Sequence, residues 1–209
     1  IGLFYSAFTQ FLGFPYYGDE YKVMGLSPYG SPDYLKEMRS IIWSGDKNIL
    51  DWNSSFFNLN SGTLSYSENN PNVSQLFDET NFEKLFGDKR SKNEEINQRH
   101  KNIASSLQRR SEELIFEIIE RAFKQTNISN LCIAGGVAQN SVANGKILNN
   151  TSIKEIYIPS AGHDAGISMG ASQYHYFHNL DNKRIAPLYD ANLGISFSNE
   201  TIKEIIERL

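Results

Sequence analysis

The pattern of apolar and polar positions over residues 130–171 predicts the unit around which the chain is organised. Residues 131–134 form a short apolar run that is typical of a buried strand, and this run leads directly into Gly135-Gly136. A helical pattern follows over 138–148, and residues 153–158 alternate as a strand does. The order strand, glycine turn, helix, strand predicts part of an α/β sheet.

A second polar turn, residues 160–163, follows the predicted strand 153–158. Asp164 then stands where a helix N-cap belongs, ahead of a helix predicted over 165–177. Ligands of α/β sheets bind at the carboxyl ends of the strands, so both turns are candidate ligand sites. A tight connection without a ligand would also explain Gly135-Gly136, and an N-cap role would also explain Asp164. Two such turns in one unit favour a ligand cleft.

The remaining apolar periodicity predicts further helices and one hairpin. Phe4, Phe8 and Phe11 form an aromatic stripe that is typical of a core helix. Residues 56–66 read as two short apolar strands around a glycine turn, which predicts a β-hairpin. The predicted helices outside the central unit cover residues 1–14, 19–25, 34–43, 102–126 and 201–209.

Composition narrows the class of protein. The chain has 209 residues, 40% apolar residues and a net charge of −4. An acidic chain without a basic stripe is a poor binder of nucleic acid. No apolar run reaches the length of a membrane span and no signal peptide is visible, so we expect a cytoplasmic protein without membrane contact. Cys132 is the only cysteine, and its place in a predicted strand favours a buried thiol.

The scattered charged side chains have no pattern of their own. Asp19 and Lys22 have the spacing of an exposed helical ion pair, which contributes little stability. A Lys ammonium in that segment would also suit ribose hydroxyls or a phosphate. We expect solvated surface positions for Arg90, His100, Arg109, Arg110, His175 and His178.

Three separated motifs resemble the NodU/CmcH-type carbamoyltransferases, which transfer carbamoyl groups to alcohols of antibiotics and Nod factors. The motifs are residues 18–30 (GDEYKVMGLSPYG), residues 134–146 (AGGVAQNSVANGK) and residues 162–166 (GHDAG), in the family's order. The similarity covers nearly the whole chain, with the weakest support over residues 45–100. Gln139 and His163 depart from the usual family pattern.

The resemblance implies a fold and a domain arrangement. The family's catalytic domain is similar to the tRNA threonylcarbamoyltransferase and belongs to the actin-like, sugar-kinase and Hsp70 fold group. We therefore expect an α/β lobe of the actin-like, ribonuclease H-like kind, a mixed sheet flanked by helices, with the β-hairpin as an insertion. Residues 1–180 would be the C-terminal part of the transferase domain. Residues 181–209 would be a linker that leads towards a YrdC-like domain absent from this chain.

The resemblance also implies chemistry. The YrdC-like domain would join ATP and carbamoyl phosphate into carbamoyl-adenylate, and the transferase domain would pass the carbamoyl group to a small-molecule alcohol. Asp164 matches a ligand of a divalent metal, iron in relatives, whose histidine ligands would lie upstream of residue 1. This chain alone would then be metal-free and inactive. The residues that match nucleotide-binding positions are Lys22, Gly25, Gly135, Gly136, Val137 and Asn140.

Two other functions stay open at this point. One is a kinase of the sugar or acetate kinase type, which would need a phosphate-binding hairpin and an acidic residue in a first lobe. The other is a non-catalytic, actin-like nucleotide-binding module, which would need no metal ligand and is disfavoured by Asp164. The acidic charge disfavours tRNA as a substrate. The sequence does not name the acceptor alcohol.

Overall fold

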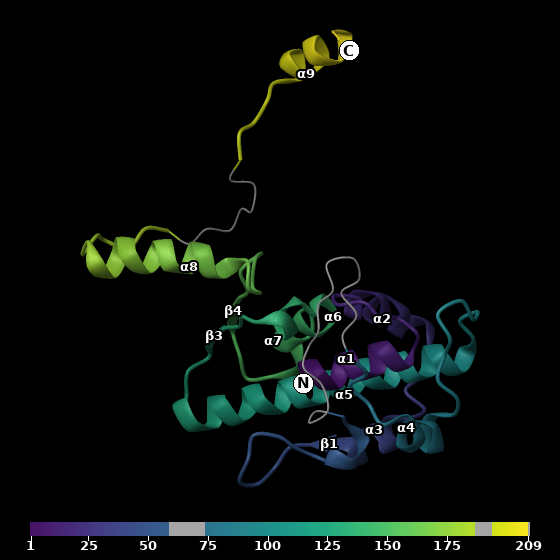
Figure 1. The fold of residues 1–209 in the computed structure, drawn as a ribbon. Coiled ribbons are helices and arrows are strands. Elements are labelled where there is room, and N and C mark those ends of the chain that lie inside the picture. The colour runs from purple at the N-terminus through teal and green to yellow at the C-terminus, as the bar shows by residue number, and fades with distance from the viewer. Residues whose placement is uncertain (59–73, 187–193, 209) are drawn as a thin grey trace. The chain divides into compact units, whose positions relative to one another are not determined.

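A computed structural model describes residues 1–58, 74–186 and 194–208 of the chain. The chain divides into two compact units, Ile1–Ile158 and Pro159–Leu209 (Figure 1). The hairpin predicted over 56–66 lies mostly outside the described residues. Its first described part forms an isolated antiparallel bridge between Phe57 and Phe77.

The first unit combines helices with two short sheets, which confirms the α/β class. One sheet pairs β1 (Ile42–Trp43) and β2 (Asp51–Trp52) antiparallel, and the other pairs β3 (Asn130–Cys132) and β4 (Glu155–Tyr157) parallel. The helices are α1 (Gly2–Phe11), α2 (Glu20–Leu26), η1 (Ser27–Tyr29), α3 (Leu35–Ile41), η2 (Ser54–Phe56), α4 (Glu79–Phe86), α5 (Gln98–Thr126), η3 (Gly136–Gln139), α6 (Ser141–Asn144) and α7 (Ile147–Asn150).

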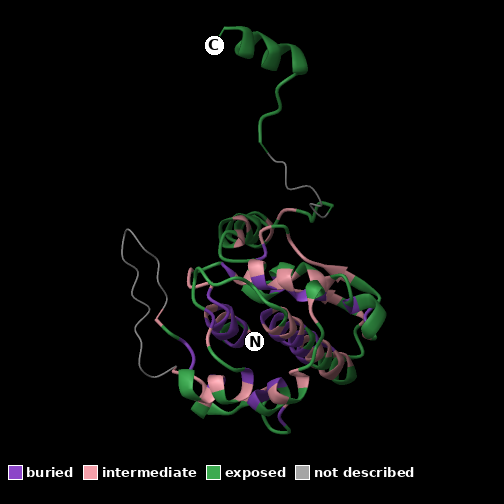
Figure 2. Ribbon diagram, turned by 90° about the vertical axis from the view of Figure 1, so that its right-hand side faces the viewer, coloured by how far each residue is buried: buried purple, intermediate pink, exposed green. Residues whose placement is uncertain are grey.

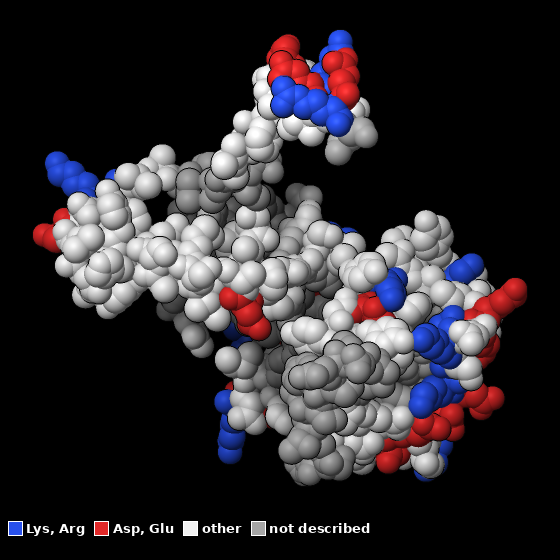
Figure 3. All heavy atoms as spheres, turned by 45° about the horizontal axis from the view of Figure 1, so that its top comes forward, with Lys and Arg blue, Asp and Glu red and all other residues white. Residues whose placement is uncertain are grey.

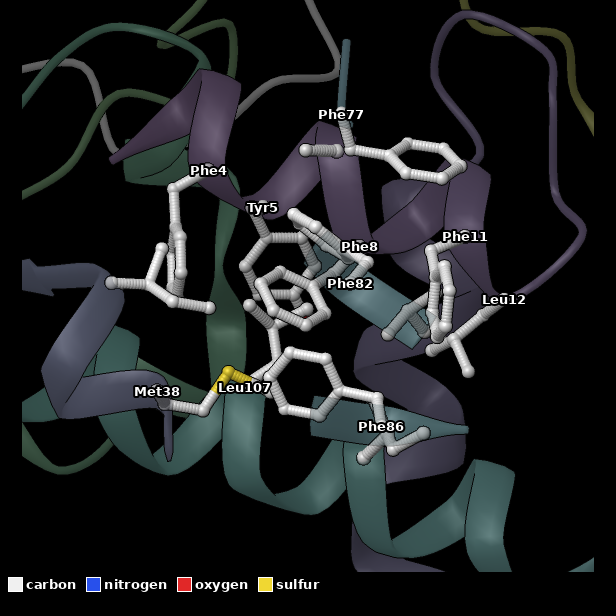
Figure 4. Packing of buried hydrophobic residues seen from close by; sticks show 14 of the residues in the cluster. Phe4, Tyr5, Phe8, Phe11, Leu12, Met38, Phe77, Phe82, Phe86 and Leu107 are labelled. Atoms are coloured by element: carbon white, nitrogen blue, oxygen red, sulfur yellow. The ribbon is translucent and has the colours of Figure 1, made fainter. Parts of the chain in front are cut away.

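Aromatic rings from α1 and α4 form the centre of the main core (Figure 4). The ring of Phe8 lies 4.7 Å from that of Phe82 and 5.1 Å from that of Phe86. Tilted and edge-on contacts of this kind add to the hydrophobic gain of burying the rings. The predicted aromatic stripe is therefore confirmed as core. Gly13 ends the helix with a φ of 79°, which a residue with a side chain rarely adopts.

The long helix α5 contacts α1, α2, α3, η1 and α6. Figure 2 shows buried residues on several helices of the first unit. Helix α5 begins at Gln98, earlier than the predicted start at residue 102, because Asn97 and His100 form a capping box. The Asn97 side chain accepts from the His100 backbone N–H, and His100 Nδ1 accepts from the Asn97 backbone N–H, each at 3.2 Å. His100 is 1% exposed, so its predicted surface position is wrong.

Two of the three arginines predicted at the surface are also buried. Arg90 donates to the carbonyl oxygens of Leu12 and Glu94, and Arg110 donates twice to that of Ile42. The guanidinium groups are buried because they satisfy carbonyl oxygens next to the ends of α1 and α3. Arg109 is exposed as predicted.

A smaller cluster of Ile119, Ile147 and Ile153 packs beside β3 and β4. The parallel pairing of these strands confirms the predicted strand–helix–strand order. Cys132 is exposed, so the predicted buried thiol is wrong. The apolar neighbours Leu131 and Ile133 are half-buried, and the alternation along the strand turns Cys132 outward. The described strands pair only in twos, so the larger mixed sheet stays a prediction.

The second unit contains α8 (Gly166–Tyr174), the π-helical turn η4 (His175–Asn179) and α9 (Asn199–Glu207). Its helix was expected to be capped by Asp164, but Ala165 holds the N-cap position and no side chain caps the helix. His175 and His178 are exposed as predicted. Ser198 caps α9 by accepting from the Thr201 backbone N–H.

Within the described ranges, none of the helices combines the length and the apolar character needed to cross a bilayer.

The packing of the main core predicts that Phe8→Ala lowers the free energy of unfolding. Phe8 is fully buried, and its removal leaves a cavity among rings that cannot collapse fully. We expect a loss of about 3–5 kcal/mol in the free energy of unfolding, measured by chemical denaturation. Leu3→Ala on the same helix is the control, because Leu3 is 55% exposed and its loss should cost far less. Equal losses in the two variants would contradict the assignment of the core.

The burial of His100 predicts that the stability of the fold depends on pH. Burial, with Arg99 nearby, holds its pKa below the ordinary value of 6.5. Below about pH 6.5 the unfolded chain therefore binds a proton at His100 more readily than the folded protein does. The free energy of unfolding consequently falls as the pH falls through that region. In His100→Gln, the amide oxygen can keep the cap without titrating. Denaturation at about pH 7 and pH 5 should show a smaller loss of stability for the variant than for the wild type.

Candidate functional site

The carboxyl end of β3 leads into a glycine turn, residues 135–140. Gly135 has φ 105° and ψ 170°, a conformation that only glycine adopts readily. A Cβ added at Gly135 or at Gly136 would meet nothing within 4 Å. Both glycines are exposed, and the space that a side chain would occupy at each is open. A ligand could therefore approach the main chain here closely, as the predicted role of the turn requires.

The helix predicted over 138–148 is broken at Asn140. The turn itself is η3, and Asn140 then leaves the helical region with φ −71° and ψ 87°. Its side-chain Oδ1 accepts from the backbone N–H of Ala143 at 3.0 Å and so caps the new helix α6. Helical periodicity alone missed this break, because an Asn can replace a helical hydrogen bond by a cap.

The side chain of Asn140 also pairs with Gln108 on α5. Asn140 Nδ2 donates to Gln108 Oε1, and Gln108 Nε2 donates to Asn140 Oδ1, both at 3.0 Å. Gln108 is 4% exposed and Asn140 is half-buried. This two-point contact, which we call the amide pair, fixes the glycine turn to the long helix.

Buried polar groups extend the amide pair on the side of α5. The Tyr5 hydroxyl donates to Gln108 Oε1 at 3.0 Å, and Gln108 Nε2 also donates to Glu112 Oε1 at 3.0 Å. Lys146 Nζ donates to the same carboxylate oxygen at 2.6 Å. Burial, together with the Glu112 charge, raises the pKa of Tyr5, so its hydroxyl stays protonated and can donate.

Sequence analysis missed Tyr5, Gln108 and Glu112. A signal was present in α5, where Gln108 and Glu112 stand within one stripe of otherwise apolar positions. Helical spacing joins them to Ala104, Ile115 and Ile119, of which Ala104 and Ile119 are buried. Polar side chains in a buried stripe need hydrogen-bond partners, and here the partner of Gln108 is Asn140 of the glycine turn.

The segment that carries Lys22 and Gly25 lies beside the glycine turn. The Ser141 hydroxyl contacts the Met24 sulfur at 3.8 Å, which brings α2 and α6 together (Figure 1). A Cβ at Gly25 would also meet nothing within 4 Å. Two segments more than a hundred positions apart in the sequence therefore meet at one surface, with glycines open to solvent on both.

Lys22 is bound to Asp19 at 2.6 Å. The Asp19 side chain is 8% exposed, so the ion pair is half-buried and not fully solvated as predicted. The hydrogen bond that Lys22 donates to Asp19 raises the pKa of Lys22, which keeps the ammonium charged. Lys22 thus provides a cation on α2, and contact with a ligand stays a prediction.

Asp164 lies in the second unit and is exposed. Its carboxylate suits a divalent cation, but one carboxylate does not hold such an ion tightly. Residues 1–58, 74–186 and 194–208 contain no group of three His, Cys, Asp or Glu side chains that could hold a metal ion. The described residues therefore do not form a complete metal site, and the role of Asp164 stays a prediction.

The charges on the face drawn in Figure 3 are mixed in sign, with Lys and Arg interspersed among Asp and Glu. No broad basic surface appears on this face.

Residues 1–173 match the family described as carbamoyltransferase N-terminus. The chain belongs to this family. The match covers the glycine turn, the α2 segment and Asp164, and it confirms the resemblance drawn from the three motifs. No part of the family assignment depends on residues 174–209.

Relatives of this carbamoyltransferase-family chain have longer sequences. It is 35% identical over 213 residues to the uncharacterized protein sll1178 of Synechocystis, covering 99% of this chain and 33% of the relative. It is 33% identical over 172 residues to nodulation protein NolO of Bradyrhizobium diazoefficiens, covering 82% of this chain and 27% of the relative. Nodulation protein NolNO of Sinorhizobium fredii is 31% identical over 173 residues, which are 82% of this chain and 22% of the relative. The chain thus spans a third or less of these relatives.

The contacts of Asn140 predict that its substitution lowers the stability of the fold, independently of any ligand. Asn140→Ala removes the cap of α6 and takes one hydrogen bond away from each polar atom of buried Gln108. We expect a loss of about 1–3 kcal/mol in the free energy of unfolding, measured by chemical denaturation. Asn140→Asp keeps the acceptor for Ala143 and should lose less. A variant Asn140→Ala as stable as the wild type would contradict the amide pair.

Proposed function

We propose that this chain is part of an ATP-dependent O-carbamoyltransferase and that its glycine turn holds the nucleotide of carbamoyl-adenylate. The observation that carries the proposal is the meeting of the glycine turn with α2. Gly25, Gly135 and Gly136 each face open space, and they come from two motifs that match nucleotide-binding positions. Membership of the carbamoyltransferase N-terminus family supports the reaction class.

The residues present suit a nucleotide. Open glycine backbones at 135 and 136 let phosphate or ribose oxygens reach main-chain N–H groups. Val137 adds an apolar side chain that is 37% exposed, which suits the face of a nucleobase or ribose. Lys22 adds a cation, and Asn140 adds an amide. The set contains donors and apolar surface, which an adenylate requires.

Carbamoyl transfer from an adenylate needs chiefly positioning and charge stabilisation, because adenylate is a good leaving group. The turn and α2 would orient the adenylate while the oxygen of the acceptor alcohol attacks the carbamoyl carbon. The bond from that carbon to the phosphate oxygen would break, AMP would leave, and the proton of the alcohol would pass to water. Asp164 would supply one ligand of a divalent metal, iron by family resemblance. Such a metal, when bound, polarises a carbonyl oxygen as a Lewis acid.

The remaining parts of the proposal concern the whole protein. Carbamoyl phosphate would enter through a YrdC-like domain, to which residues 181–209 lead, and residues 1–180 would complete an actin-like lobe. The parallel pair β3 and β4 supports such a lobe, because it places the glycine turn at a carboxyl strand end. Two relatives are named nodulation proteins, which supports an alcohol acceptor of the sugar, antibiotic or Nod-factor type. Location in the cytoplasm is part of the same proposal.

Calorimetric titration of the full-length protein with ATP tests the nucleotide site. Gly136→Val would fill the open space over the turn, so we expect the affinity for ATP to fall at least about tenfold. Gly194→Val is the matched control, since it also adds a side chain where nothing lies within 4 Å. The control should bind ATP as the wild type does.

Two results would contradict the site. The first is an affinity for ATP that Gly136→Val leaves unchanged. The second is an equal loss in Gly136→Val and Gly194→Val. Release of carbamoylated acceptor from carbamoyl phosphate and ATP, lost in Gly136→Val, would link the site to the reaction.

A further inference from the structure

We propose that Gln108 is a positioning residue that fixes the side-chain amide of Asn140 so that it offers the nucleotide an N–H donor. The inference rests on the proposed function and deepens it. It assigns a role to a buried side chain of α5 that is outside the three motifs. It also states which kind of ligand atom can accept a hydrogen bond from the amide of Asn140.

The orientation of the Asn140 amide follows from two fixed partners. The backbone nitrogen of Ala143 can only donate, so the Asn140 atom that it meets is the oxygen Oδ1. Gln108 Nε2 donates to the same oxygen at 3.0 Å. The amide nitrogen Nδ2 must then lie on the other side, where it donates to Gln108 Oε1 at 3.0 Å.

The orientation of Gln108 is fixed in turn by Glu112. An ionised carboxylate only accepts hydrogen bonds, so the Gln108 atom that meets Glu112 Oε1 is the nitrogen Nε2. Lys146 Nζ, 2.6 Å from the same oxygen, stabilises the negative charge of the carboxylate. Glu112 is 1% exposed, and its second oxygen has no partner within the described residues. The ionised carboxylate is therefore held through the oxygen that Gln108 and Lys146 share.

Gln108 has no polar capacity left for a ligand. Its nitrogen donates to Glu112 and Asn140, and its oxygen accepts from Asn140 and from the Tyr5 hydroxyl. A primary amide has two donor hydrogens and two acceptor lone pairs, so all four are used. Gln108 consequently acts on a ligand only through Asn140.

Asn140 keeps one hydrogen-bond donor. One hydrogen of Nδ2 goes to Gln108, and the second has no partner among the residues that the structure describes. Asn140 is only half-buried, so part of the residue is open to a ligand. Its complement is an acceptor atom, such as a phosphate oxygen, a ribose oxygen or a ring nitrogen of adenine. A nucleotide carries all three.

A double-mutant cycle on ATP affinity in the full-length protein tests the inference. The variants are Gln108→Met, Asn140→Ala and the two combined, each first shown to be folded by thermal unfolding. Gln108→Met removes one of the two partners that fix the Asn140 amide, so we expect about tenfold weaker binding of ATP. The combined variant should bind no more weakly than Asn140→Ala, because Gln108 acts through Asn140. Gln108→Glu keeps the volume but cannot donate to Asn140 Oδ1, and should weaken binding similarly.

Ser106→Ala is the matched control on α5. Ser106 is also fully buried, and its hydroxyl accepts from the backbone N–H of Tyr34 on a side of the helix that does not contact the glycine turn. Its loss should lower thermal stability but leave ATP affinity unchanged. Adenosine binding then identifies the acceptor: a parallel loss assigns the N–H to the nucleoside, and a loss with ATP alone assigns it to a phosphate.

Three results would overturn the inference. They are unchanged ATP affinity in folded Gln108→Met, losses that multiply in the combined variant, and an equal loss in Ser106→Ala. If one of these results is found while Gly136→Val still binds ATP weakly, the proposed nucleotide site stands and only the role of Gln108 is removed. If Gly136→Val binds ATP with the affinity of the wild type, the proposed nucleotide site itself is contradicted.

Discussion

Burial of polar side chains on helix α5 is the constraint on which the rest of the first unit depends. Gln108, Arg110 and Glu112 are 4%, 6% and 1% exposed. A buried polar group without a partner costs about 1–3 kcal/mol, so each of these side chains requires a partner from another element. Arg110 binds the carbonyl oxygen of Ile42, which directly follows α3. Gln108 and Glu112 bind the glycine turn and Lys146. One helix thereby positions elements far apart in the sequence.

This constraint explains how an exposed turn can be well ordered. The glycines at 135 and 136 have no side chains and meet nothing nearby, so they contribute little packing of their own. The turn is held instead from behind, by the amide pair and by the cap on α6. Ligand contacts are then free to be made by the open backbone. Preorganisation of this kind lowers the cost of binding, since fewer groups must be ordered when the ligand arrives.

Apolar periodicity predicted the elements better than it predicted the environment of individual polar residues. The stripe of Phe4, Phe8 and Phe11 identified the core helix, and alternation identified the parallel strands. The same reasoning placed His100, Arg90 and Arg110 at the surface, because charge favours solvent unless a partner is known. Those partners are backbone groups at helix and strand ends that a sequence pattern does not show. Cys132 was misplaced for a different reason: an apolar run does not say which face of a short strand is covered.

The candidate site was predicted in part. The glycine turn and the α2 segment were found from their motifs, and the structure adds that they are neighbours. The support of the turn by Gln108 and Glu112 depends on long-range contacts, which spacing along the chain does not encode. The predicted helix over 138–148 also hid the cap at Asn140. Local pattern thus located the turn, while tertiary contacts determine how its side chains are used.

Hydrogen–deuterium exchange of the full-length protein, with and without ATP, tests most directly whether the turn is a nucleotide site held by α5. The account predicts that ATP slows exchange at the backbone amides of residues 135–140 and 20–26. Exchange in α4 should not change, because that helix packs in the core away from the turn. Saturation with ATP that leaves residues 135–140 unprotected would contradict the account.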